Sequence, residues 1–402
     1  MKITDFETFV VANPPPRFGG RYFIFVKLTT DDGIVGYGEI YAATFGPHTI
    51  AAMALDVAER HLIGHNPFHI ERLWRNVYGS GYNLRPDPSL LGVLSGMEMA
   101  CWDIVGKACD KPVYELLGGQ VHEGLRSYTY IYPHEGDAYP ADYDESHVYV
   151  NADTAAERAL DYVEQGFTAV KFDPAGTYTV YDGGMPTLEE LDRSERFVRT
   201  IREAVGDRAD LLFGTHGQFT AAGAIRLARR LEPYDPLWFE EPVPPDNVDE
   251  MARVARQTSI PVATGERLCT KQEFGRLLVQ QAASILQMNL GRVGGLLEAK
   301  KIAGMAEVFY GQIAPHLYCG PIVGAANIQL ATCSPNFLIL EGIERWDGFH
   351  ADLLEVPVKW EDGYVIPSRE PGLGVVLDEE VARANPWDGS ELQLEISYDP
   401  VR

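Results

Sequence analysis

The spacing of apolar residues changes along the chain and divides it into two regions. In the first 40 residues, ITDFETFVV, FIFVKLTT and IVGYGEI alternate as strands do, and Asp31-Asp32-Gly33 joins the second run to the third. Asp-Gly between two apolar runs is a hairpin signal, so we expect a small antiparallel meander. Residues 48–120 instead carry apolar residues at helical spacing, in HTIAAMALDVAERHLI and LLGVLSGMEMACWDIVGKACD.

From about residue 125, short apolar runs alternate with helical patterns. The strand candidates are SYTYI, TAVKFDP, DLLFGTHG, PLWFEEP, PVATGER, ASILQMNLG, QIAPHLY and NFLILEG. This alternation predicts an α/β protein with a (β/α)8 TIM-type barrel. The expected domains are residues 1–124, completed by about 372–402, and a barrel over 125–371. Residues 133–150 and 174–187 are expected to be polar βα loops at the catalytic end.

Composition limits the partners of this chain. Its net charge of −24 repels phosphate backbones and argues against nucleic-acid binding. No run approaches the roughly 20 apolar residues of a membrane span, and MKITDFETFVV lacks the features of a secretory signal. Five cysteines without a CxxC pair suit reduced thiols, so a cytoplasmic protein is expected. An acidic chain that binds an anion needs a local cation, and a metal is the economical source.

Two glutamates have the spacing that carboxylate chemistry requires. Removal of an α-proton from a carboxylate needs a cation at its oxygens, a base beside the α-carbon, and an acid for any leaving group. Glu240 ends LWFEEP and Glu266 ends PVATGER, 26 residues later, which is one βα unit. Each acid alone could be a helix cap or a surface charge, but the equal spacing after apolar strands favours a shared site. Glu241 is expected to point away, into structural pairing.

Two histidines flank these acids in strand order. A further step of 26 residues back from Glu240 falls on Gly214, where a third carboxylate would be expected. His216 lies two residues later and therefore on the same face of an extended segment. His316 ends the seventh strand candidate, in QIAPHLYCGP. A lone histidine is more often a structural hydrogen-bonding residue, but two at strand ends beside the acids favour catalysis.

The motifs as a set resemble the enolase superfamily. They are GMEMACWDIVGKACDKPVYELLGG, KFD, WFEEP, GER, ILQMNLGRVGG and APHLYCGP, and they cover nearly the whole chain. Within the mandelate racemase/muconate lactonizing enzyme-like proteins, GER, THG and APH…GP are most similar to the mannonate/galactonate dehydratase branch. The resemblance implies an α+β N-terminal capping domain, a Mg2+ ion, and a lyase that removes water from an aldonic acid. It also implies a small-molecule sugar-acid substrate and a homo-oligomer, a dimer or octamer.

The resemblance also implies roles for individual residues. By position, Glu240 and Glu266 correspond to metal ligands, and Glu341 to a polar group near the substrate carboxylate. His316 would abstract the α-proton, and His216 would protonate the departing 3-hydroxyl.

The chain departs from the family pattern at three places. Gly214 stands where the family has an aspartate ligand, and the second strand has Lys171-Phe172-Asp173 instead of Lys-x-Lys. Because these strands are neighbours in a barrel, we predict that Asp173 is the third metal ligand and that Gly214 leaves room for it. Lys171 then remains as a base or as an electrostatic clamp on the substrate. Asn289 replaces the aspartate that orients the seventh-strand histidine, and it could contact the substrate.

Two further residues are candidate substrate contacts. Arg21 lies in the segment RFGGRY of the first-domain loop that closes on the barrel in this superfamily, and it could recognise the distal polyol or be solvated. Tyr130, with Tyr128 and His134, follows the first strand candidate and could contact substrate or pack in the barrel core.

Two alternatives to dehydration remain open. Racemisation, epimerisation or cycloisomerisation would use the same enolate without a leaving hydroxide. A catalytically inactive sugar-acid-binding member is favoured by Gly214 and Asn289, and the retained glutamates and histidines argue against it. The identity of the sugar acid does not follow from the sequence, because specificity resides in loops.

Overall fold

A computed structural model describes residues 1–82, 84–134, 146–173 and 183–393. The N-terminal region is an antiparallel meander packed on helices. Its elements are β1 (Ile3–Ala12), β2 (Tyr22–Thr30), β3 (Val35–Ile40), α1 (Pro47–His61), α2 (Ile70–Tyr78), α3 (Pro88–Ala108) and α4 (Val113–Leu116). The sheet order is β1-β2-β3, and Gly33, with φ of +79°, turns the chain between β2 and β3. The expected meander, hairpin and helices are therefore present.

The second region is a barrel of eight parallel strands. They are β4 (Leu125–Tyr130), β5 (Ala169–Phe172), β6 (Asp210–Gly214), β7 (Trp238–Glu240), β8 (Val262–Thr264), β9 (Ile285–Leu286), β10 (Gln312–Ile313) and β11 (Leu340–Gly342). Neighbours pair in chain order from β4 to β10, β11 pairs with β4, and a bridge from Ile313 to Phe337 closes the circle. All eight strand candidates are barrel strands, which confirms the expected fold class.

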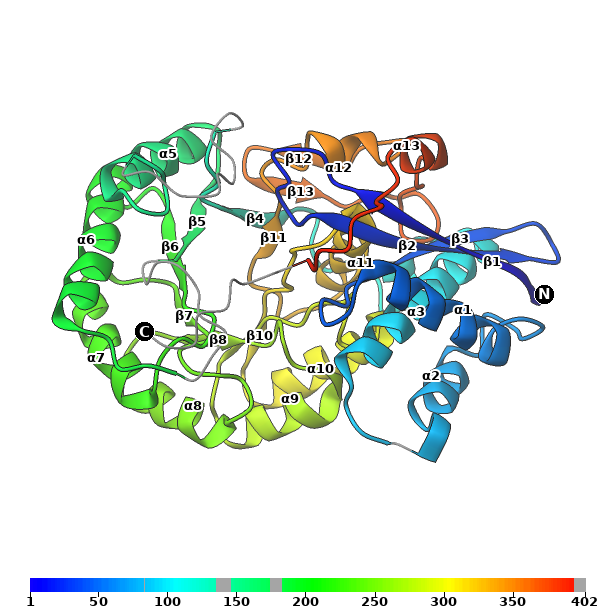
Figure 1. The fold of residues 1–402 in the computed structure, drawn as a ribbon, viewed down its shortest axis with the longest axis horizontal. Coiled ribbons are helices and arrows are strands. Elements are labelled where there is room, and N and C mark those ends of the chain that lie inside the picture. The colour runs from blue at the N-terminus through cyan, green and yellow to red at the C-terminus, as the bar shows by residue number, and fades with distance from the viewer. Residues whose placement is uncertain (83, 135–145, 174–182, 394–402) are drawn as a thin grey trace.

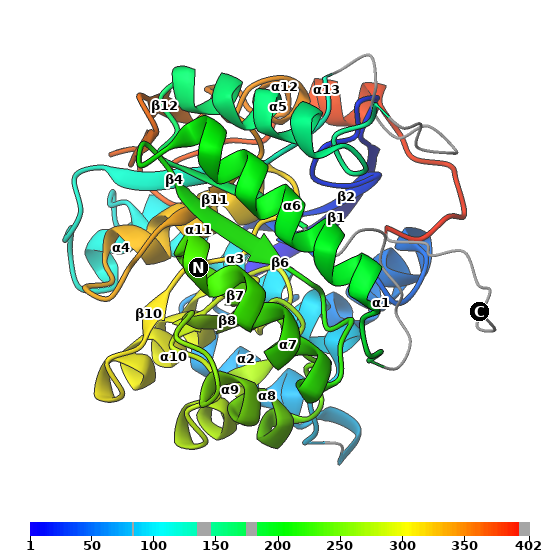
Figure 2. The same ribbon diagram turned by 90° about the vertical axis from the view of Figure 1, so that its left-hand side faces the viewer.

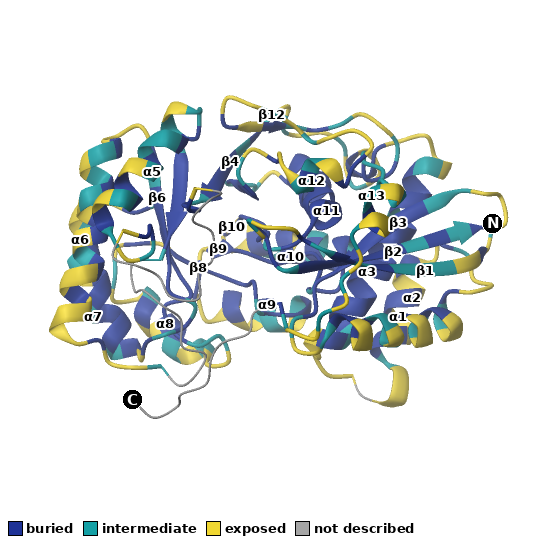
Figure 3. Ribbon diagram, turned by 45° about the horizontal axis from the view of Figure 1, so that its top comes forward, coloured by how far each residue is buried: buried dark blue, intermediate teal, exposed yellow. Residues whose placement is uncertain are grey.

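Helices surround the strands, as Figures 1 and 2 show. They are α5 (Ala152–Glu164), α6 (Leu188–Val205), α7 (Ala221–Leu231), α8 (Val248–Ala255), α9 (Thr270–Val279), α10 (Leu296–Val308) and α11 (Pro321–Thr332). After β11 come α12 (Phe349–Asp352), β12 (Lys359–Glu361), β13 (Tyr364–Ile366) and α13 (Glu379–Ala384). In Figure 3 the barrel strands are largely buried, whereas the outward faces of α6 and α7 are exposed.

The C-terminal segment returns to the first region. Pro386 bridges Val11 of β1, and the Gln393 side chain accepts hydrogen bonds from the backbone amides of Arg21 (3.0 Å) and Tyr22 (3.2 Å). The predicted loops at 133–150 and 174–187 lie largely outside the described residues.

One helix, α3, is long and apolar enough to cross a membrane by length and composition alone. Within the fold, however, 89% of its apolar window is buried. Its apolar surface is therefore used as core, mainly against β3, where the close approach depends on glycine. A Cβ at Gly38 would lie 1.9 Å from the Gly96 carbonyl oxygen.

Two buried glutamates attach the N-terminal region to barrel helices. Glu98 of α3 accepts hydrogen bonds from the amides of Leu296 (2.7 Å) and Leu297 (2.8 Å), the first residues of α10. Glu39 of β3 likewise accepts from Gly320 and Val323 at the start of α11. The first amides of a helix lack intrahelical partners and favour negative charge, so each glutamate satisfies donors that would otherwise be buried unpaired.

We predict that Glu98→Ala lowers the free energy of unfolding by about 3 kcal/mol, because buried N–H groups of α10 lose their acceptor. Urea denaturation measures this change. The exposed residue Glu115 supplies the control, since Glu115→Ala should cost less than about 0.5 kcal/mol. Equal stability of the two variants would show that the contact does not hold the regions together.

Candidate active site

The side-chain period of a strand places the site residues in one layer above an apolar layer. The barrel interior holds a cluster of Tyr128, Ala169, Leu212, Trp238, Ala263, Ile285, Ala314 and Ile339. Residues two positions further along the chain point to the same side. These positions carry Lys171, Gly214, Glu240, Gln287, His316 and Glu341. The alternation thus brings polar side chains from five strands, with Gly214 beside them, to the carboxyl end of the barrel.

Lys171 lies between two buried carboxylates. Its Nζ is 2.7 Å from Glu240 Oε1 and 3.4 Å from Glu341 Oε1. Although burial alone would lower the pKa of Lys171, these glutamates raise it well above its usual value. The ammonium is therefore held charged, which supports the clamp over the base among the two predicted roles.

Glu240 is engaged on both oxygens. Besides Lys171 at Oε1, its Oε2 accepts from Gln287 Nε2 at 2.7 Å and from Trp238 Nε1 at 3.1 Å. Neither Gln287 nor Trp238 was predicted from the sequence. Their spacing offered a signal, because each lies two residues from a predicted site residue, Asn289 and Glu240 respectively.

Asp173 and His216 form a second ion pair. Asp173 Oδ2 lies 3.1 Å from His216 Nδ1, and the residue at 214 leaves room for both. A Cβ at Gly214 would be 3.6 Å from Asp173 Oδ1 and 3.9 Å from His216 Cε1. Burial lowers the pKa of His216, but Asp173 and Glu266 outweigh it and raise that pKa to about 9. The structure thus brings Asp173 to a histidine, and its predicted role as a metal ligand stays a prediction.

Glu266 stands between the two histidines. It follows Gly265, whose φ of +139° turns the chain at the end of β8. Its carboxylate oxygens lie 3.2 Å from His316 Nε2 and 3.9 Å from His216 Nε2. Burial raises the pKa of Glu266, but the surrounding basic groups, with Lys171 among them, hold it below its usual value. A negative charge therefore lies where the two imidazoles converge.

His316 has a different environment from His216. Its Nδ1 lies 2.9 Å from the Asn289 side-chain nitrogen, which is also 3.2 Å from Cys319 Sγ. Burial lowers the pKa of His316 to about 4, and Glu266 opposes this only in part. At neutral pH His316 is therefore uncharged, whereas His216 is an imidazolium.

Glu341 and Glu241 take different positions. Glu341 is buried at the rim and accepts from the Leu317 amide at 2.8 Å, beside the strand end that carries His316. Glu241 points away from the site and pairs with Arg267 at 2.7 Å, as the sequence predicted. Arg267 itself was not predicted.

The other candidate contacts lie in an aromatic group near the end of β4. Tyr130 packs against Tyr132 (5.6 Å between ring centroids) and Tyr149 (5.8 Å), and Tyr132 stacks on Phe18 at 4.4 Å. Phe18 belongs to the loop that also carries Arg21, so this loop contacts the barrel rim as expected.

Tyr128 and His134 have other surroundings. Tyr128 is fully buried against Trp238 and belongs to the core. His134 is largely exposed, 4.0 Å from Asp161. The roles of Arg21 and Tyr130 toward substrate stay predictions.

The described carboxylates do not form a ready metal site. Within residues 1–82, 84–134, 146–173 and 183–393, no group of three or more His, Cys, Asp or Glu side chains is placed to hold one ion. Two of the predicted ligands already have protein partners. Lys171 pairs with Glu240, and His216 pairs with Asp173. A Mg2+ ion, which needs near-octahedral oxygen ligands, would have to share these carboxylates with Lys171 and His216 or displace them.

Sequence comparison identifies relatives over both regions. The chain matches the family described as mandelate racemase / muconate lactonizing enzyme, N-terminal domain, over residues 15–118, and the enolase C-terminal domain-like family over residues 154–381. A D-xylonate dehydratase from Haloferax volcanii is 34% identical over 399 residues, covering 97% of this chain and 90% of the relative. A D-galactonate dehydratase from Ralstonia nicotianae is 36% identical over 387 residues, covering 94% and 93% respectively.

Structural comparison agrees with these matches. A solved structure of a mandelate racemase/muconate lactonizing enzyme-like protein from Labrenzia alexandrii has a TM-score of 0.95 and 67% sequence identity, and it covers 99% of this chain and 100% of that chain. A second, from Burkholderia SAR-1, has a TM-score of 0.96 and 61% identity, with 100% and 98% coverage.

We predict that Lys171→Met strengthens Mg2+ binding by about ten-fold or more, or about 1.4 kcal/mol, because Glu240 and Glu341 lose their internal cation. Isothermal titration calorimetry compares the two proteins. Lys301→Met is the matched control, since Lys301 forms an ion pair with Glu71 at the protein surface. Unchanged or weaker binding in Lys171→Met would mean that Lys171 does not compete with the ion.

Proposed function

Because the chain belongs to the mandelate racemase / muconate lactonizing enzyme family of the enolase superfamily, we propose that it is a sugar-acid dehydratase, a lyase that removes water from an aldonate. Relatives named for D-xylonate and D-galactonate dehydration, at 34% and 36% identity over most of the chain, support this activity. The reaction breaks the C–H bond next to the carboxylate and then the bond from C3 to its hydroxyl. The substrate is accordingly a small anionic molecule.

The observation that carries this proposal is the Asp173–His216 pair at the barrel mouth. A carboxylate at Nδ1 leaves Nε2 as the nitrogen that exchanges protons with the substrate. The pKa of about 9 makes His216 a strong base when neutral and, at neutral pH, a charged acid. An acid of this kind can protonate a departing hydroxide, which is the step that distinguishes dehydration from racemisation.

Lys171 supplies positive charge to the same space. Its ammonium lies between the carboxylates of Glu240 and Glu341 at the barrel mouth. A fixed cation in a buried site stabilises negative charge that develops on a substrate carboxylate, because little solvent screens it. The sequence assigns the α-proton to His316, and that role requires an unprotonated Nε2 on His316.

Members of the enolase superfamily generally use a divalent metal ion. We propose Mg2+ as the ion, with Glu240, Glu266 and Asp173 as the donors predicted from sequence. When bound, such an ion supplies further positive charge at the substrate carboxylate. In the arrangement described, Mg2+ would compete with Lys171 and His216 for these carboxylates. We also propose that the protein is cytoplasmic and forms a homo-oligomer, a dimer or octamer. Light scattering at micromolar concentration tests the oligomeric state.

An inactive sugar-acid-binding protein is the second candidate. The specific observation in its favour is that Lys171 already occupies an oxygen of Glu240, a predicted metal ligand. Incubation with a library of aldonic and aldaric acids and Mg2+ separates the two candidates. We expect a 2-keto-3-deoxy product from at least one aldonate, detected by a semicarbazide assay. Binding by calorimetry without any product would favour the inactive protein.

For the aldonate that reacts, we predict that His216→Gln lowers kcat by about 100- to 10,000-fold, the usual contribution of a positioned acid–base group. Steady-state kinetics measure the loss. His65→Asn, at an exposed histidine outside the barrel, should retain the activity of the unchanged protein. A His216→Gln variant with near-normal kcat would remove this residue from the mechanism.

A further inference from the structure

The orientation of the Asn289 amide is fixed by a backbone donor. Asn289 is fully buried beyond the end of β9, and its Oδ1 lies 2.9 Å from the Gly291 backbone nitrogen. A backbone N–H can only donate, so the side-chain atom that faces it must be the oxygen. Rotation of the amide by 180° would place an NH2 group against the Gly291 N–H. The usual ambiguity of amide orientation is therefore removed by the hydrogen-bond network.

The opposite end of the amide faces His316. Asn289 Nδ2 is 2.9 Å from His316 Nδ1 and 3.2 Å from Cys319 Sγ. An amide NH2 only donates, so His316 Nδ1 must accept, and the single proton of the neutral ring lies on Nε2. A doubly protonated ring would set two donors face to face at Nδ1. Glu266 Oε2 lies 3.2 Å from Nε2 without forming a hydrogen bond, and its negative charge is compatible with a proton on that nitrogen.

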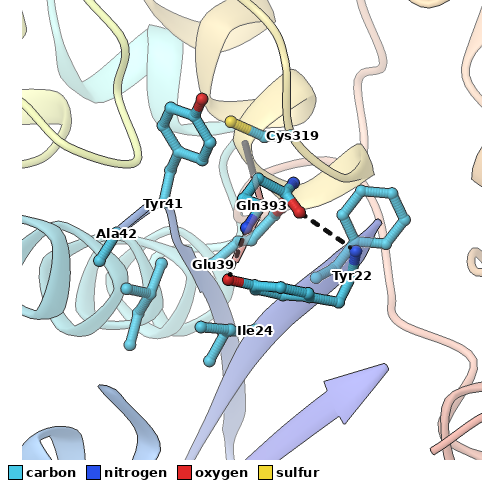
Figure 4. A pocket seen from close by; sticks show the side chains of 9 residues that line it. Tyr22, Ile24, Glu39, Tyr41, Ala42, Cys319 and Gln393 are labelled. Carbon is cyan, nitrogen blue, oxygen red and sulfur yellow. Dashed lines mark hydrogen bonds between the residues drawn. The ribbon is translucent and has the colours of Figure 1, made fainter. Parts of the chain in front are cut away.

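The surroundings leave Asn289 little freedom to move. Its own carbonyl accepts from the amides of Arg292 (3.0 Å) and Val293 (2.8 Å). A Cβ at Gly291 would lie 2.9 Å from Tyr41 Cβ, so the chain packs closely against the N-terminal region there. Behind it, Cys319 and Tyr41 line a small pocket between β3 and the start of α11, and their side chains face one another (Figure 4).

We propose that Asn289 is a positioning residue that holds His316 as the Nε2–H tautomer, so that His316 meets the substrate as a hydrogen-bond donor and not as the base. An aspartate at this position would accept a hydrogen bond from Nδ1–H and leave Nε2 unprotonated and free to take the α-proton. Asn289 instead donates a hydrogen bond to Nδ1, and its side chain is about the same size as that of an aspartate. His316 then donates to a substrate oxygen that gains negative charge.

The α-proton passes instead to the Asp173–His216 pair, and this part rests on the proposed dehydration. His216 takes the proton at Nε2 from its neutral form, which is the minor form at neutral pH, while the C–H electron pair enters the enediolate. The same proton is then delivered to the 3-hydroxyl as the C–O pair leaves with water, and His216 returns to its neutral form. One residue thus removes and returns the proton, which corresponds to syn elimination.

Nitrogen NMR of the histidine ring tests the tautomer without any substrate. In full-length protein labelled with [15N]histidine at pH 7, the His316 signals are those lost in His316→Gln. We expect a protonated Nε2 and an unprotonated Nδ1 in the unchanged protein. Asn289→Asp should move the proton to Nδ1 or add a second proton. An unchanged protein with Nδ1 protonated and Nε2 bare would overturn the proposal, whether or not the variant folds.

Asn327→Asp is the matched control for a new buried carboxylate. Asn327 is also fully buried and donates to the His316 backbone carbonyl at 3.1 Å, but it does not face the ring nitrogens. The His316 tautomer should stay as in the unchanged protein. A tautomer change in both aspartate variants would mean that general electrostatics, and not the Asn289 contact, set the proton position.

Kinetics separate the role of His316 from the proposed function itself. Glutamine can donate a hydrogen bond but cannot act as a base, so His316→Gln should lose less than about ten-fold in kcat, far less than His216→Gln. Equal losses in the two variants would overturn the assignment of the α-proton to His216. If no aldonate reacts at all, the proposed function fails, while the NMR result still decides the tautomer.

Discussion

The need to bury several carboxylates in one barrel mouth governs the arrangement around it. Asp173, Glu240, Glu266 and Glu341 come from four strand ends, and an unpaired buried carboxylate is costly. Each therefore lies beside a basic group: Lys171 beside Glu240 and Glu341, His216 beside Asp173, and both histidines beside Glu266. Removing one member of such a buried pair typically costs about 3–5 kcal/mol, so the side chains are held in place as a set.

The two histidines show how neighbouring groups divide the chemistry of one site. His216 has a carboxylate at Nδ1 and His316 has an amide nitrogen there, at 3.1 Å and 2.9 Å. The first partner accepts a hydrogen bond and the second can only donate one, so the two rings expose opposite properties at Nε2. The same residue type thus serves as a proton carrier on one side of Glu266 and as a neutral donor on the other.

The N-terminal region contributes to this site through the ends of barrel helices. Glu98 and Glu39 hold the first turns of α10 and α11, and those helices follow the strand ends that carry Asn289 and His316. The loop before β2 reaches the rim through Phe18, which stacks on Tyr132. The capping region therefore fixes one wall of the barrel mouth in addition to covering it.

The sequence alone determined the eight strands and the residues at their ends, because strand periodicity and the spacing of Glu240 and Glu266 are local properties of the chain. It also predicted that Glu241 would pair away from the site, since alternate residues of a strand face opposite sides. The sequence did not determine the partners of these residues. That Lys171 binds Glu240, that Asp173 binds His216, and that Asn289 turns its nitrogen toward His316 depend on distances between strands and on the Gly291 amide. Such contacts join segments far apart in the chain, so only the tertiary structure decided which carboxylates are available and which nitrogen of each histidine carries the proton.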